Sequence, residues 1–106
     1  MIGTLPRDSV VALACDAGYA PYAFFVSQQL ALQNPDRIFD ICIFSADDLE
    51  LPPSLADHCI EIRKIEAEAL NFASRFSLGR HGIAAFLRLL MPELVSGRYH
   101  RLLYLD

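Results

Sequence analysis

Four short apolar runs constrain the fold of this chain more than any other feature. They are Val10 to Cys15, Ile38 to Ser45, Cys59 to Ile62 and Leu102 to Leu105. Their hydrophobicity is continuous rather than alternating, which is typical of strands covered on both faces, as in a parallel sheet. The sequence therefore predicts an α/β fold, a Rossmann-like half-sheet of about four mainly parallel strands with flanking helices.

The segments between these runs carry helical signals. They are Tyr19 to Gln33, a short helix opening at Pro52-Pro53-Ser54, a partly helical connection at Glu66 to Ser77, and a helix from Ile83 to Gly97. The first ends where a proline disfavours helical backbone in the residue before it. The last is the best defined, because its apolar residues recur at i, i+3, i+4, i+7, i+8 and i+11 and so form one helix face.

Length and composition predict one compact unit without a domain boundary. The chain has 106 residues, 54% of them hydrophobic and 21% charged, which is too apolar for a disordered tail. Neither repeats nor Gly/Ser-rich linkers interrupt it. No apolar run reaches the roughly 18 residues of a membrane span, and the first residues do not resemble a signal peptide, so a cytoplasmic protein is the expectation.

Charge and cysteine content exclude several classes of function. Nine Lys and Arg residues against thirteen Asp and Glu give a net charge of -4, which offers no broad cationic surface, so nucleic acid is not an expected partner. Cys15, Cys42 and Cys59 each lie in an apolar run and lack the spacing of a zinc site. We predict that all three are buried, reduced thiols.

Two carboxylates follow predicted strands, at the edge where doubly wound sheets bind ligands. Asp16 lies in a loop of small residues after the first strand, and Asp106 ends the last. With the aromatic plane of Tyr19, the Asp16 loop would suit a nucleotide base. The alternative is structural: Asp16 would cap the following helix and Tyr19 would cover the core. Asp106 needs a partner carboxylate to bind a hard cation well, and otherwise reads as a turn residue.

Three ordered blocks of the sequence resemble the retaining glycosyltransferases of family 8. They are Leu13 to Tyr19, Ala85 to Leu89 and Leu103 to Asp106. These blocks are similar to the family's small-x-Asp-x-x-Tyr nucleotide loop, its aromatic-x-Arg-Leu helix and its Tyr-Leu-Asp-x-Asp metal motif, and together they span nearly the whole chain. The resemblance implies a GT-A fold that transfers galactose or glucose, with retention, from a UDP-sugar to a saccharide or lipopolysaccharide acceptor.

The resemblance also implies roles for individual residues, although it assigns no catalytic one. The implied donor-binding residues are Ala14, Cys15, Asp16, Ala17, Gly18, Tyr19, Arg88 and Asp106. Asp16 and the backbone before it would hold uracil and ribose, and Tyr19 would stack on the base. Arg88 would lie near the sugar and the metal-site carboxylates, where a guanidinium fork can hold both. Asp106 would be a ligand of a manganese or magnesium ion that bridges to the diphosphate.

Departures from the family pattern limit what this chain is expected to do alone. Gly18 stands where many relatives have a polar residue. The second aspartate of the D-x-D motif, a later metal-binding histidine and the acceptor-binding half are absent, so we expect residues 1–106 to be the N-terminal, donor-binding part of a transferase, inactive by itself. The same interpretation allows peripheral association with the inner face of a membrane through the missing part. It also allows self-association along an exposed strand edge.

Two other classes of protein fit the same pattern. One is a non-catalytic nucleotide-binding or receiver-like regulatory module, although a receiver would usually carry an acidic pair after its first strand, where this chain has Asp16 followed by Ala17. The other is an interaction domain that binds no nucleotide. Dinucleotide dehydrogenases and P-loop enzymes lose support, because neither glycine-rich fingerprint is present.

Overall fold

The computed structural model describes residues 8–65, residue 92 and residues 95–105. They form a four-stranded sheet in which every pairing is parallel and the order is β3-β2-β1-β4. The strands are β1 (Ser9–Ala14), β2 (Phe39–Ser45), β3 (Ile60–Lys64) and β4 (Arg101–Leu105). This architecture confirms the predicted α/β class, and each strand lies within two residues of its predicted limits.

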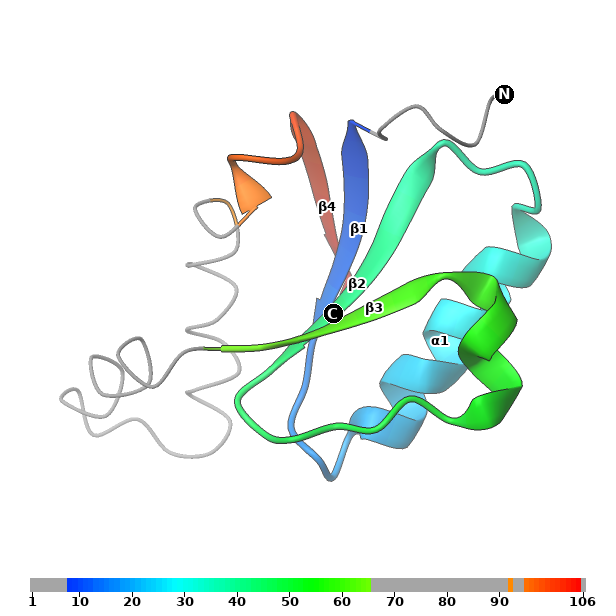
Figure 1. The fold of residues 1–106 in the computed structure, drawn as a ribbon, viewed down its shortest axis with the longest axis vertical. Helices are drawn as coiled ribbons and strands as arrows, with labels where there is room; N and C mark the ends of the chain where they lie inside the picture. Colours follow the sequence, from blue (N-terminus) through cyan, green and yellow to red (C-terminus); the bar gives the residue numbers. More distant parts are fainter. Residues whose placement is uncertain (1–7, 66–91, 93–94, 106) are drawn as a thin grey trace, which may run out of the picture.

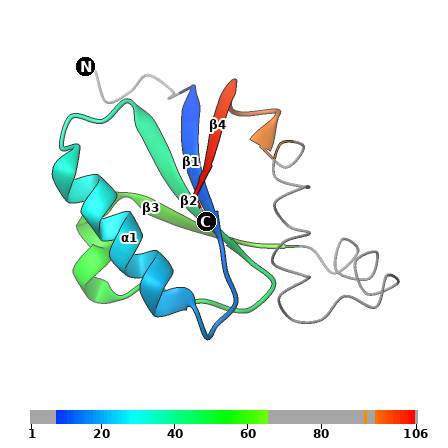
Figure 2. The same ribbon diagram turned by 180° about the vertical axis from the view of Figure 1, so that it is seen from behind.

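Both faces of the central strands are covered, which explains their continuous hydrophobicity. The helix α1 (Ala20–Gln33) and the 3-10 helix η2 (Pro53–His58) lie on the same side of the sheet (Figure 1) and are seen from the other direction in Figure 2. They pack with Leu13, Ile41 and Ile43 in one core. On the opposite face, Val95 and Tyr99 pack with the alternate residues of β1 and β2.

The first helix begins and ends for local reasons. Proline stands in its first turn, where the missing N–H would have no partner anyway. At the other end, the side-chain amide of Asn34 donates a 2.9 Å hydrogen bond to the carbonyl of Leu30, an acceptor that the ending helix leaves open. The next residue, Pro35, disfavours further helix. The boundaries therefore follow the sequence signals closely.

The prediction that all three cysteines are buried is wrong for Cys59. Cys15 and Cys42 are buried, whereas Cys59 is exposed. The residue ends η2 in the left-handed region, with φ of 56°, so it belongs to the turn before β3 rather than to the strand. An apolar run read from sequence does not show which of its end residues turns outward.

Several predicted features lie outside the described residues. They are the connection at Glu66 to Ser77, most of the helix from Ile83, and the site residues Arg88 and Asp106. Of that second helix, Pro92 and Val95 have helical backbone, and residues 96–98 form a turn. Within the described parts of the chain, no helix combines the length and hydropathy needed to cross a bilayer.

Candidate functional site

The strand order places the end of β1 beside the end of β4. The chain runs from β1 outward to β2 and β3 and then returns to form β4 on the other side of β1. Leu13 pairs with Leu105 in register. The described ends of β1 and β4 therefore lie at the same edge of the sheet, and the loop after β1 starts there. In open α/β sheets, such a reversal of strand order is where ligands bind.

Asp16 organises the loop between β1 and α1. Its Oδ1 accepts a 3.0 Å hydrogen bond from the backbone N–H of Tyr19, and its backbone carbonyl accepts from the same N–H at 3.2 Å. The expected capping role is thus partly present, but it applies to the turn before α1, because Tyr19 is itself the N-cap residue. Tyr19 is 57% exposed, so it does not cover the core.

The second anchor of this loop, Asp47, was missed by sequence reasoning. Its Oδ2 accepts a 2.8 Å hydrogen bond from the backbone N–H of Ala17. The backbone N–H of Asp47 donates in turn to Oγ of Ser45 at 3.1 Å. Ser45 is fully buried at the end of β2. One sequence signal could have identified Asp47: it is an acidic residue just beyond the predicted second strand. Neighbouring parallel strands end at the same edge of a sheet, so residues that follow them lie close together.

The thiol of Cys15 lies in this environment of carboxylates. Burial raises its pKa to about 11, and the negative charges of Asp16 and Asp47 add to the effect. A thiol with so high a pKa stays protonated near neutral pH, and a protonated thiol is a poor nucleophile and a poor metal ligand. Cys15 therefore contributes backbone and packing to the loop rather than reactivity.

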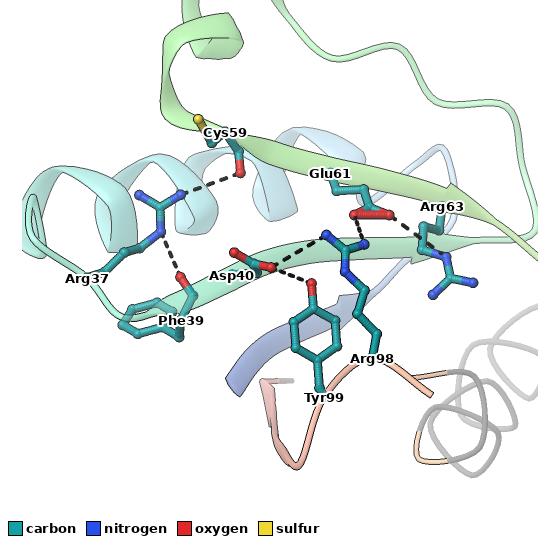
Figure 3. Close-up of polar contacts among 8 residues, drawn as sticks. All are labelled: Arg37, Phe39, Asp40, Cys59, Glu61, Arg63, Arg98 and Tyr99. Carbon is teal, nitrogen blue, oxygen red and sulfur yellow. Dashed lines mark hydrogen bonds and ion pairs between the residues drawn. The ribbon is translucent and has the colours of Figure 1, made fainter. Parts of the chain in front are cut away.

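A second polar group, here called the Asp40 cluster, lies on the sheet face opposite α1 and consists of Asp40, Glu61, Arg98 and Tyr99 (Figure 3). Nη1 of Arg98 lies 2.9 Å from Oε2 of Glu61, and Nη2 lies 3.7 Å from Oδ2 of Asp40. The hydroxyl of Tyr99 also donates to Asp40. One guanidinium thus contacts two carboxylates, and these contacts fasten the turn before β4 onto β2 and β3.

Of the residues implied for the donor site, the structure brings those of the β1–α1 loop together at the edge of the sheet. Ala17, Gly18 and Tyr19 are exposed there, and Ala14 and Cys15 lead into them. The predicted roles of Arg88 and Asp106 stay predictions. Within residues 8–65, 92 and 95–105, no group of three or more His, Cys, Asp or Glu side chains is placed to hold a metal ion.

No family model, curated protein or solved structure matches the chain. The sheet order and the helix-covered parallel strands nevertheless define its class. It is a Rossmann-like α/β half-fold.

Proposed function

We propose that this chain is the nucleotide-binding part of a glycosyltransferase that moves a hexose, galactose or glucose, from a UDP-sugar to a saccharide acceptor with retention. The observation that supports this most is the pairing of Leu13 with Leu105, which sets the Asp16 loop beside the end of β4. Two of the three blocks that resemble family 8 lie at these two strand ends. A donor bound there would meet both at once.

The loop after β1 has the chemistry to hold a nucleoside. The exposed ring of Tyr19 offers an aromatic plane for the base. Gly18 has no side chain to keep a ligand away from the backbone. The Asp16 carboxylate can accept hydrogen bonds from uracil N–H or ribose hydroxyls. Together these groups bind and orient the donor without themselves reacting.

The proposed manganese or magnesium ion depends on Asp106 and on further ligands, none of which is among the described residues. Asp16 and Asp47 already accept hydrogen bonds from loop amides, so in this arrangement they hold the loop. When bound, the ion would supply neutralisation of charge on the leaving UDP. The role proposed for Asp106 is that of one oxygen ligand, with Arg88 near the sugar. A cytoplasmic site and a lipopolysaccharide acceptor belong to the same proposal.

Calorimetric titration of the chain with UDP, with and without MnCl2, tests the proposal. We expect metal-dependent binding that Tyr19→Ala weakens about tenfold, because stacking of a base on an aromatic ring is worth about 1–3 kcal/mol. Asp16→Ala should weaken binding by a similar factor of about ten, since it removes a charged acceptor. Tyr22→Ala is the matched control, because that ring is equally exposed, at 59%, but lies on α1.

Two outcomes would contradict the proposal in different ways. A folded sample that ignores UDP under both conditions favours an interaction domain. Metal-independent binding that neither Asp16→Ala nor Tyr19→Ala weakens would place the nucleotide elsewhere and favour a regulatory module. Circular dichroism of each variant shows whether the fold is retained.

A further inference from the structure

The carboxylate of Asp47 accepts the hydrogen bond of the Ala17 backbone N–H, a donor of the kind that binds phosphate in other α/β folds. In many α/β folds, the amides between the first strand and the first helix bind phosphate. Here the N–H of Ala17 points at Oδ2 of Asp47, 2.8 Å away. A phosphate at that amide would have to displace a charge-assisted hydrogen bond and lie against a negative carboxylate.

Asp47 is held in place by the core rather than by the loop it contacts. Its N–H donates to Oγ of Ser45, and the carbonyl of Ser45 accepts a 2.9 Å hydrogen bond from the N–H of Ile65. Ser45 is fully buried. The end of β1 is joined to β2 as well, because the N–H of Cys15 donates to the carbonyl of Phe44 at 3.1 Å. The position of the Ala17 amide is therefore set by β2.

We infer that Asp47 is a positioning residue of the nucleotide loop. By holding the Ala17 amide, it keeps the loop in the form that receives the nucleoside and makes that amide unavailable to the phosphates of the donor, which lie toward the end of β4. The inference rests on the proposed nucleotide function. On this inference the loop after β1 contacts only the base and ribose of the donor. In dinucleotide-binding folds the corresponding loop contacts the phosphates instead.

The test compares three variants and two ligands by NMR-detected titration, which measures weak binding. Asp47→Ala removes the acceptor, Asp47→Asn keeps an oxygen acceptor without the charge, and Asp48→Ala is the neighbouring control. Asp48 is 88% exposed and pairs with Lys64. Uridine and UDP are titrated into each in the presence of MgCl2, whose diamagnetic ion leaves nearby resonances sharp, and the Ala17 amide resonance reports the hydrogen bond directly.

We expect Asp47→Ala to weaken the binding of uridine and of UDP by the same factor, about tenfold, because the lost bond involves a charged group and orders the nucleoside contacts. Asp47→Asn should restore uridine binding to within about threefold of the original, since the acceptor is replaced. Asp48→Ala should change neither affinity. The Ala17 amide should lose its downfield shift and its exchange protection only in Asp47→Ala.

The outcomes separate this inference from the proposed function. If the unmodified chain binds neither ligand, the nucleotide function itself fails. If it binds both and Asp47→Ala binds them equally well, the function stands and the positioning role of Asp47 is wrong. If Asp47→Asn binds UDP more tightly while uridine is unchanged, the phosphates lie beside Asp47, and the assignment of the loop to the nucleoside is overturned.

Discussion

The hydroxyl of Tyr99 donates a 2.5 Å hydrogen bond to Oδ2 of Asp40, which precedes it by 59 residues (Figure 3). Tyr99 is buried just before β4, and Asp40 is the second residue of β2. The bond therefore joins the turn that starts β4 to a strand that is not its neighbour in the sheet. It helps to set where β4 begins, and through that the register of Leu13 with Leu105.

Replacing Tyr99 by phenylalanine removes this bond with little change in packing. We expect the free energy of unfolding to fall by about 1.5 kcal/mol, the range of a hydrogen bond to a charged group in a half-buried setting. Urea denaturation followed by circular dichroism measures it. Tyr22→Phe is the control and should change stability by less than about 0.5 kcal/mol, because that ring is exposed. An equal loss in both variants would contradict the assignment.

The same tyrosine predicts a loss of stability at alkaline pH. Burial first, and then the hydrogen bond to Asp40, raise the pKa of Tyr99 above its ordinary value of 10.0. Above about pH 10 the unfolded chain releases this proton while the folded chain keeps it, so the stabilisation is complete below pH 10 and declines above it. The stability difference between the original chain and Tyr99→Phe should shrink between pH 9 and pH 11. A constant difference would contradict the prediction.

Arg37 fastens the segment after α1 to the turn before β3. Its Nε donates to the carbonyl of Phe39 at 3.0 Å, and its Nη2 donates to the carbonyl of His58 at 2.7 Å. We expect Arg37→Ala to lower the free energy of unfolding by about 2 kcal/mol. Arg37→Lys should restore less than half, because an ammonium group lacks the fork that reaches both carbonyls. Full rescue by lysine in thermal melts would show that charge alone matters.

The buried hydroxyl of Ser27 lowers the stability of the fold. It is fully buried on α1, and its hydroxyl has no hydrogen-bond partner among the described residues. Ser27→Ala should raise the free energy of unfolding by about 1 kcal/mol, because it removes an unsatisfied polar group and improves helix propensity. Ser54→Ala, at an exposed position, serves as the control in the same denaturation experiment. A loss of stability in Ser27→Ala would reveal a partner for the hydroxyl.

The three thiols should differ sharply in reactivity. Burial raises the pKa of Cys15 to about 11 and that of Cys42 to about 12, whereas Cys59 is exposed. At pH 8 we expect one fast-reacting thiol per chain with a chromogenic disulfide, and three after addition of denaturant. Cys59→Ser should abolish the fast phase. Two or more fast thiols in the folded chain would contradict the burial of Cys15 and Cys42.

Among the described residues, local signals in the sequence were sufficient for the strands and the first helix but not for the contacts between them. Continuous apolar runs predicted the strands because both sheet faces are covered, and Asn34-Pro35 predicted the end of α1 because proline acts on its immediate neighbour. The outward turn of Cys59 was not predictable in this way. It depends on how η2 meets β3.

The same distinction between local signals and long-range contacts applies to the candidate site. By itself, the sequence determined a parallel α/β sheet and a small-residue loop with Asp16 and Tyr19, because these follow from hydrophobic runs and adjacent residues. Only the tertiary structure decided that β4 lies beside β1, that Asp47 accepts a hydrogen bond from the amide of Ala17, and that Asp40 accepts one from the hydroxyl of Tyr99. Those partners are separated by 30 or more residues, and contacts at that range depend on strand order, which no local pattern encodes.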